Sequence, residues 1–177
     1  EARDLDDDDD DPPSMSPTEL PQHETPCTPK ATPTDAAQRN FTDPDSRIMP
    51  SDGTFLQGYN AQAAVDEAHQ IIVATGLSNQ SADNDYLEPM VRRVHASLGK
   101  YPMCLTADAG YWSPESVPRL EADGAHLLIS LAREGKAESE RIPVEDPRYS
   151  MSKRLESDVG KDIYRRRKAT VEPVFGQ

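Results

Sequence analysis

The sequence predicts a mixed α/β domain, with helices packed on a mixed sheet, behind an acidic and proline-rich segment. Short apolar or alternating runs recur between residues 58 and 129, and stretches with helical spacing separate them. Residues 1–45 hold 13 acidic and 3 basic side chains, whereas residues 46–177 hold 19 acidic and 16 basic ones. The net charge of −13 therefore belongs mainly to the leading segment. Only 35% of the chain is hydrophobic, so we expect part of it to carry no core of its own.

The leading segment, residues 1–40, is predicted to be disordered. An unbroken acidic block occupies residues 6–11, and seven prolines follow within residues 12–33. Like charges extend such a chain, and proline withholds a backbone donor. The segment is interpreted either as a solvated linker or as an acidic interaction tail. We place the folded domain at residues 41–177.

A β-hairpin is predicted near the start of the domain. Turn chemistry occupies residues 42–47, and Asp52 and Gly53 form another turn signal. Residues 58–66 alternate as a strand does, and residues 70–76 form a second, β-branched strand. Because only a short polar turn joins these two strands, they must pair antiparallel.

The middle of the domain is predicted to alternate helices and strands. A buried stripe recurs through residues 81–98 at helical spacing, and Gly99 supplies the stop. An apolar strand at residues 103–108 should join the sheet of the hairpin. A helix at residues 113–122 follows, with Ser113 as N-cap and Pro114 at its first position. It would cross over to a parallel strand at residues 125–129.

Asp108 is the first candidate site residue. It stands where the strand at residues 103–108 ends and the next helix has not begun. The carboxyl ends of strands in open α/β sheets are where ligands and metals bind, because several loops converge there. The alternative is an aspartate that only caps the turn.

The C-terminal part is predicted to be a polar loop at residues 133–150 and a basic helix from residue 153 to 167. Tyr164, Lys168 and Glu172 follow at four-residue steps and share one face if the helix is continuous. Residues 165–168 are uninterruptedly basic, which suits DNA phosphates or a solvated surface. Pro173 disfavours helical geometry at Glu172, so we expect a kink or a new helix start near residues 171–173.

The predicted order of elements matches the RNase H-like fold from its second strand onward. Four segments are distinctive: residues 38–47 (QRNFTDPDSR), 58–62 (GYNAQ), 107–111 (ADAGY), and 165–168 (RRRK) leading to 171–176 (VEPVFG). With these segments in this order, residues 38–177 resemble the DDE transposases of bacterial insertion sequences. The resemblance implies a partial RNase H-like core and a cytoplasmic bacterial protein.

The resemblance also implies metal-dependent DNA cleavage and strand transfer. Asp108 would be the second of three carboxylates and Glu172 the third, together holding two Mg²⁺ or Mn²⁺ ions. Such hard cations take oxygen ligands and act on the attacking and leaving oxygens. The DNA-binding residues would be Tyr164, Arg165, Arg166, Arg167 and Lys168. The implied partners are the ends of the insertion sequence and its target, together with a homo-oligomer.

Three departures from the family pattern lead us to expect a truncated C-terminal part that is inactive alone. The first aspartate belongs on a strand upstream of the hairpin, and Asp66 at the hairpin turn is a weak substitute for it. A missing first strand would also leave a sheet edge uncovered. The spacing of Tyr164, Arg167 and Glu172 is one residue off the commonest form of the family unless Lys168 replaces the arginine. The basic residue that often follows the glutamate is missing before Gln177.

Three classes of function stay open on the sequence. They are DNA transposition by the intact parent protein, a non-catalytic DNA-binding remnant, and an interaction module that works through the acidic tail. Two cysteines, Cys27 and Cys104, make no disulfide framework, which is typical of a reducing cytosol. No apolar run is long enough for a membrane span.

Overall fold

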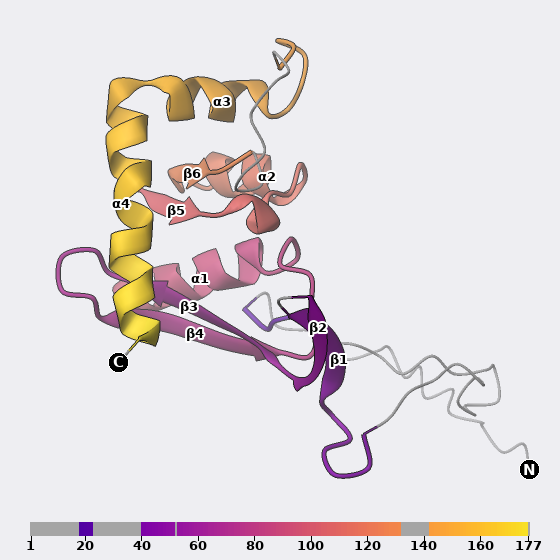
Figure 1. Ribbon diagram of the computed structural model, residues 1–177. Coiled ribbons are helices and arrows are strands. Elements are labelled where there is room, and N and C mark those ends of the chain that lie inside the picture. Colours follow the sequence, from indigo (N-terminus) through magenta and orange to yellow (C-terminus); the bar gives the residue numbers. More distant parts are fainter. Residues whose placement is uncertain (1–17, 23–39, 52, 132–141, 177) are drawn as a thin grey trace, which may run out of the picture.

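The computed structural model describes residues 18–22, 40–51, 53–131 and 142–176 (Figure 1). These residues form the predicted mixed α/β architecture, with three two-stranded sheets. The strands are β1 (Arg47–Ser51), β2 (Thr54–Gly58), β3 (Asn60–Val65), β4 (Ile72–Ser78), β5 (Leu105–Ala107) and β6 (Leu127–Ile129). The helices are α1 (Leu87–Leu98), the short 3₁₀-helix η1 (Ala109–Tyr111), α2 (Ser116–Ala122), α3 (Tyr149–Glu156) and α4 (Asp158–Phe175).

Two antiparallel hairpins open the domain. The predicted pairing of residues 58–66 with residues 70–76 is confirmed, since β3 pairs antiparallel with β4. The hairpin of β1 and β2 was not predicted as strands, although its turn was. Gly53 in that turn has φ of +77°, a conformation that costs other residues energy. Asp-Gly between two strand-like runs is a strong hairpin signal, and it marked this turn correctly.

The predicted crossover is confirmed, but its sheet is not the predicted one. β5 and β6 pair in parallel, with α2 between them in the chain. The strand predicted at residues 103–108 was expected to join the sheet of the hairpin, and this was wrong. Within the described residues β5 pairs only with β6, and β3 only with β4. The physical reason is a cavity that both strands line, so their edges do not reach each other.

The helices of the middle region begin later than predicted. α1 starts at residue 87 instead of 81, because the chain turns first at Asp83, whose carbonyl accepts from the backbone N–H of Tyr86 at 3.0 Å. α1 ends as predicted, with Gly99 in the left-handed conformation. α2 starts at residue 116, yet Ser113 still caps its first turn, because its Oγ accepts from the backbone N–H of Ser116 at 3.1 Å.

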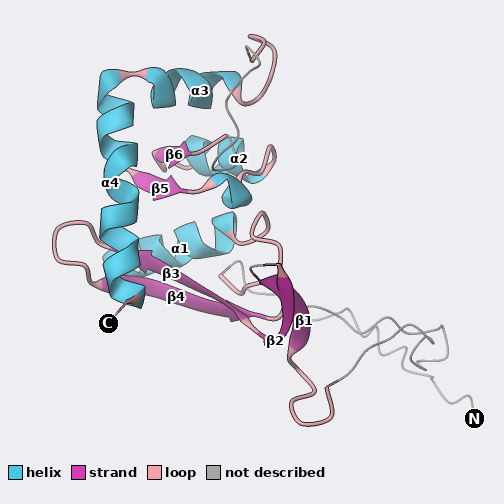
Figure 2. Ribbon diagram, in the orientation of Figure 1, coloured by secondary structure: helices cyan, strands magenta, loops and turns pink. Residues whose placement is uncertain are grey.

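The single helix predicted at residues 153–167 is two helices. α3 ends before Ser157, and α4 begins after it and runs to Phe175. Ser157 breaks the helix because its backbone is extended and its Oγ accepts from the backbone N–H of Gly160 at 3.0 Å. Figure 2 shows α3 and α4 as separate helices that meet at an angle. Residues 132–141 of the predicted loop lie outside the described residues.

Pro173 lies inside α4 and does not start a new helix. Proline has no N–H, so the carbonyl of Ala169, four residues earlier, has no helical donor. The side-chain amide of Gln70 donates to that carbonyl at 3.2 Å. Gln70 is in the turn between β3 and β4 and has φ of +55°. The proline thus leaves an acceptor that ties the end of α4 to the hairpin.

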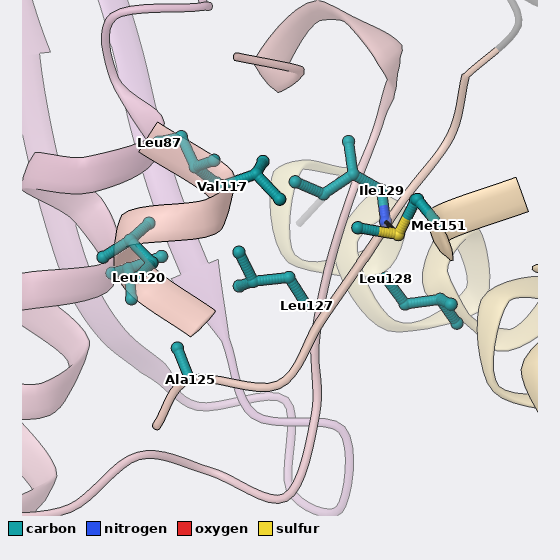
Figure 3. Packing of buried hydrophobic residues seen from close by; sticks show 9 residues of the cluster. Leu87, Val117, Leu120, Ala125, Leu127, Leu128, Ile129 and Met151 are labelled. Atoms are coloured by element: carbon teal, nitrogen blue, oxygen red, sulfur yellow. Dashed lines mark hydrogen bonds between the residues drawn. The ribbon is translucent and has the colours of Figure 1, made fainter. Parts of the chain in front are cut away.

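The main core lies where α1, α2, β6 and α3 meet (Figure 3). Met151 of α3 is completely buried there, and its sulfur accepts from the backbone N–H of Ile129 at 3.3 Å. The buried residues of this cluster are Leu87, Val91, Val117, Leu120, Ala125, Leu127, Leu128, Ile129 and Met151. Burial of each large apolar side chain stabilises the fold by about 1.5–3 kcal/mol.

A second, smaller core lies between α1 and β4, and part of the leading segment contributes to it. Residues 18–22 form no helix or strand, but Leu20 is buried against Gly76 and Met90. A Cβ at Gly76 would lie 2.3 Å from Leu20 Cδ1, so the close approach requires glycine. The buried residues of this cluster are Leu20, Ala74, Tyr86, Met90 and Val94. The other residues predicted to be disordered, except Asn40, lie outside the described residues.

Candidate active site

A cavity of about 900 Å³ lies between β3 and β5 and contains the principal candidate residue. Consecutive residues of both strands line it, and α1 and α4 supply further walls. Asp83 and Asp108 line the cavity together with Tyr111, while Asp66 and Glu67 line it after β3 ends. Its size is in the upper range of ligand pockets, about 300–1,000 Å³.

Asp108 has the turn-capping role considered for it from the sequence, and its role as a ligand for a metal stays a prediction. It precedes η1 with an extended backbone, and its Oδ1 accepts from the backbone N–H of Gly110 at 3.1 Å, as a turn cap does. Its Oδ2 lies 3.8 Å from Nη1 of Arg167 on α4. The side chain is half exposed, so capping leaves its second oxygen accessible.

Asp83 is a carboxylate of this site that sequence reasoning missed. A Cβ on Gly110 would lie 3.1 Å from Asp83 Oδ2 and 3.2 Å from Asp108 Oδ1, so the two carboxylates meet around that glycine. Asn60 and Gln62 of β3 donate to Asp83 Oδ1 at 2.8 and 3.1 Å. In the sequence, the signal for Asp83 is the polar alternation of Asn60 and Gln62 in β3. Their partner, Asp83, lies more than 20 residues further along the chain, so this signal does not identify it.

Tyr111 lies beside this pair of carboxylates. Burial raises the pKa of its hydroxyl well above the ordinary value, and the negative charges of Asp83 and Asp108 raise it further. The nearby Arg167 lowers it, with a smaller effect. Tyr111 is therefore a neutral group at any physiological pH and a potential hydrogen-bond donor next to two anions.

The predicted DNA-binding residues on α4 differ in exposure. Arg167 is half-buried near Asp108, and its guanidinium lies 5.5 Å from the centre of the Tyr164 ring. Arg165 and Lys168 are exposed, and so is Lys161, which is not among the predicted DNA-binding residues. Arg166 is also exposed and forms an ion pair with Glu67. Lys161, Arg165 and Lys168 lie at positions i, i+4 and i+7, so they form one stripe, called here the basic stripe.

Glu172 lies on the continuation of the basic stripe, four residues after Lys168. The predicted common face of Tyr164, Lys168 and Glu172 follows from the continuity of α4, with Tyr164 partly buried against the main core. Glu172 is exposed and, among the described residues, is not one of those that line the cavity with Asp108. Its pairing with Asp108 stays a prediction.

Asp66 has the turn role considered for it from the sequence. Its Oδ2 accepts from the backbone N–H of His69 at 2.9 Å and lies 3.2 Å from Nδ1 of the His69 ring. Its carbonyl also accepts from the backbone N–H of Gln70. These bonds fix the turn between β3 and β4.

The side-chain atoms that meet around Gly110 are carboxylate oxygens of Asp83 and Asp108, and such oxygens are suitable ligands for Mg²⁺ or Mn²⁺. Within the described residues, no three histidine, cysteine or acidic side chains form a group that could hold a metal ion. Two carboxylates therefore fit part of a metal site. Arg167 offsets some of their charge when no cation is bound.

Comparison with known proteins bears on this site. The model of a protein family described as "transposase DDE domain" matches residues 18–177. The match covers more than half of the chain and includes every residue that lines the cavity. No curated protein and no solved structure matches the sequence. None of the described helices is long and apolar enough to cross a membrane.

Proposed function

The chain belongs to the transposase DDE domain family, and on that premise we propose that it is part of an enzyme that cuts and joins DNA at the ends of a bacterial insertion sequence. The family connects the chain with DNA transposition in general. The observation that carries the finer proposal is the meeting of Asp83 and Asp108 around Gly110, at the end of β5. The proposed setting is the bacterial cytoplasm, with DNA and further copies of the protein as partners.

Asp108 is proposed to hold a divalent cation, Mg²⁺ or Mn²⁺. Its accessible oxygen and the nearby carboxylate of Asp83 are the donors that support this role. Glu172 is proposed as a further ligand that moves toward Asp108 when the ion binds, since it does not line the cavity that contains Asp108. When bound, the ion activates an attacking oxygen and stabilises the leaving one.

Residues of this chain are proposed to position DNA beside the carboxylates. The basic stripe on α4 is exposed, and Glu172 continues it, so DNA bound there would lie next to a proposed metal ligand. Tyr164 and Arg167 are partly buried on the same helix, and Arg167 approaches Asp108. Arg167 is proposed to shift from Asp108 to a phosphate when a cation takes its place.

Alone, this chain is proposed to be inactive. Within the described residues Asp108 meets one other carboxylate, and the second metal ion needs further ligands. A non-catalytic DNA-binding remnant is the second candidate, favoured by the position of Glu172, which is exposed and is not among the described residues that line the cavity with Asp108. The acidic block proposed for an interaction tail lies outside the described residues.

Binding of Mn²⁺, followed by electron paramagnetic resonance, tests the metal site without an activity assay. Asp108→Asn should weaken Mn²⁺ binding at least tenfold, because a neutral amide replaces a charged ligand. Asp83→Asn and Glu172→Gln report which carboxylate shares the ion. Glu115→Gln, which changes an exposed acidic residue before α2, is the matched control. Equal binding by Asp108→Asn and the control would refute the assignment of Asp108.

A cleavage assay tests the proposed lack of activity. The purified chain is incubated with a labelled insertion-sequence end and Mg²⁺ or Mn²⁺, beside an Asp108→Ala variant. We expect no specific cleavage or strand transfer from either protein. Cleavage by the unaltered chain that the Asp108→Ala variant lacks would show that this chain is a working enzyme.

A further inference from the structure

The segment of residues 58–62 is distinctive in the sequence, and the proposed function leaves its polar residues Asn60 and Gln62 without a role. The two residues are two positions apart in β3, so their side chains lie on the same face of the strand. Gln62 is only 6% exposed. Burial of an amide is costly unless its polar atoms are bonded, so the partners of Gln62 indicate what it does.

The side chains of Asn60, Gln62 and Asp83 form a closed triangle of hydrogen bonds. Both amides donate to Oδ1 of Asp83, Asn60 at 2.8 Å and Gln62 at 3.1 Å. Gln62 also donates to Oδ1 of Asn60 at 2.7 Å. An ionised carboxylate only accepts hydrogen bonds, so each amide has to turn its NH₂ group toward Asp83. The triangle therefore fixes the orientation of all three side chains.

The triangle occupies one oxygen of Asp83 and leaves the other oxygen for a different partner. Within the described residues, neither a hydrogen bond nor an ion pair reaches Oδ2 of Asp83. A Cβ on Gly110 would lie 3.1 Å from this oxygen and 3.2 Å from Oδ1 of Asp108. Because residue 110 is glycine, no side chain fills the space beside the two carboxylates. Oδ2 is therefore the oxygen of Asp83 that can bind a cation together with Asp108.

The backbone of Asp83 is also held in place. Its carbonyl accepts from the backbone N–H of Tyr86 at 3.0 Å, and Tyr86 is completely buried. With the backbone fixed, the carboxylate can exchange its two oxygens only if the bonds from both amides break. A ligand that is oriented before the cation arrives loses less conformational freedom on binding it. Groups that hydrogen-bond a metal ligand typically change metal affinity about tenfold to a hundredfold.

We propose that Asn60 and Gln62 are positioning residues, which hold Asp83 so that its Oδ2 binds the divalent cation together with Asp108. Both amides act through Asp83 and are not themselves proposed as ligands. This inference rests on the proposed function, because it needs a cation at Asp108. It adds the way in which the distinctive segment of β3 contributes to the site.

Mn²⁺ affinity, followed by electron paramagnetic resonance, tests the proposal on the full chain. Gln62→Met and Asn60→Leu keep side chains of similar size and remove the amide donors, and each should weaken Mn²⁺ binding about tenfold or more. Asn79→Leu is the matched control. Asn79 is 7% exposed, its amide donates to the Asp45 carbonyl at 2.8 Å, and it does not line the cavity. This variant should bind Mn²⁺ like the unaltered chain. Circular dichroism confirms that all three variants are folded.

A double-mutant cycle separates a positioning role from a merely structural one. Asp83→Asn removes the charged ligand that the amides orient, so the addition of Gln62→Met to this variant should weaken Mn²⁺ binding little further. The two effects on Mn²⁺ affinity are then far from additive, as expected for groups that act as one unit. A glutamine that only stabilises the fold would weaken binding by the same factor in both backgrounds.

Three outcomes would overturn the inference, and they can be told apart. If the unaltered chain binds no Mn²⁺, or if Asp108→Asn binds it equally well, the proposed function fails and the inference fails with it. If Asp108→Asn weakens binding but the two amide variants match the control, only the inference fails, and the triangle serves to attach the start of α1 to β3. Additive effects of Gln62→Met and Asp83→Asn would also refute it, because Gln62 would then not act through Asp83.

Discussion

At the scale of single residues, a few buried polar groups fix the geometry around the candidate site. Tyr86 is completely buried, and its hydroxyl lies 2.7 Å from the Gln80 carbonyl oxygen and 2.9 Å from the Ser78 hydroxyl. The same Ser78 donates to the carbonyl of Pro21. This network joins the leading segment, the end of β4 and the start of α1. It therefore holds the chain that leads to Asp83.

Tyr86→Phe should lower the free energy of unfolding by about 1–2 kcal/mol, because the Gln80 carbonyl loses a buried hydrogen-bond donor. The matched control is Tyr59→Phe. The hydroxyl of Tyr59 donates to Asp43 at 2.8 Å at the surface, so its loss should cost clearly less than the loss of the Tyr86 hydroxyl. Urea unfolding measures both. Equal effects of the two substitutions would mean that the network around Tyr86 contributes nothing beyond an exposed bond.

Alkaline pH should destabilise the fold through Tyr111. Burial and two neighbouring carboxylates raise its pKa in the folded state, so its contribution is complete below the unfolded pKa of about 10 and is lost as pH rises above it. The loss should be roughly 1 kcal/mol per pH unit. Urea unfolding between pH 8 and pH 11 measures it, and Tyr111→Phe should be less sensitive. The same dependence in both proteins would exclude Tyr111 as its cause.

Sequence patterns could identify Asp108 but not its partner. Asp108 ends an apolar strand, and such a position is visible in the sequence because it depends only on neighbours in the chain. Asp83 lies in a polar turn, and its role depends on Asn60, Gln62 and Gly110, which only the fold brings near. For Glu172, the four-residue periodicity predicted that it shares a helix face with Lys168, and the continuity of α4 agrees with this. The distance between Glu172 and β5 depends on how α4 packs, which the periodicity does not determine.

At the scale of elements, the junction between α3 and α4 shows how one residue decides where a helix ends. The sequence predicted one basic helix because residues 153–167 lack proline and contain good helix formers. Ser157 followed by Asp158 is an N-cap signal, and in the structure it starts α4. Gly160 lets α4 begin close to the end of α3, since a Cβ there would lie 1.9 Å from the Arg154 carbonyl oxygen.

Gly160→Ala should destabilise the protein by about 1–3 kcal/mol, although alanine is the better helix former by about 1 kcal/mol. The reason is the clash with Arg154, which has to push α3 and α4 apart. Gly176→Ala at the other end of α4 is the control. Its Cβ would meet no atom closer than 3.5 Å, so its effect should be near zero. A stabilising Gly160→Ala would show that the two helices are free to separate at this junction.

At the scale of the whole molecule, the fold has two cores, and residues of both line the cavity. Leu105 and Tyr111 pack against both clusters and so connect them. Figure 1 shows α4 running past both the β5–β6 unit and the β3–β4 hairpin. The sequence predicted β3, β4, β5 and β6 but placed them in one sheet, and it did not predict β1 and β2 as strands. Local patterns identify a strand, whereas its neighbour in the sheet depends on which edge lies beside it.

The distribution of charge over the molecule limits how it can bind DNA. The chain has a net charge of −13, so a duplex is repelled at long range and attracted only where cations gather. The basic stripe of Lys161, Arg165 and Lys168 is such a place. Arg165 also pairs with Asp162 at 2.9 Å, and an exposed pair of this kind is weak enough for a phosphate to replace it.

Binding to duplex DNA should therefore depend on salt through the basic stripe. Each phosphate that a cation neutralises adds a slope of about −0.9 to the plot of log affinity against log salt concentration. The double substitution Arg165→Gln and Lys168→Gln should reduce the magnitude of this slope by about two units and weaken binding at every salt concentration. The matched control, Lys100→Gln with Arg119→Gln, removes the same charge from exposed positions elsewhere. It should weaken binding only through net charge and keep the slope.

Fluorescence anisotropy over a range of salt concentrations measures DNA binding by both variants. If they lose the same slope, the chain binds DNA through its overall charge, and α4 does not form the interface.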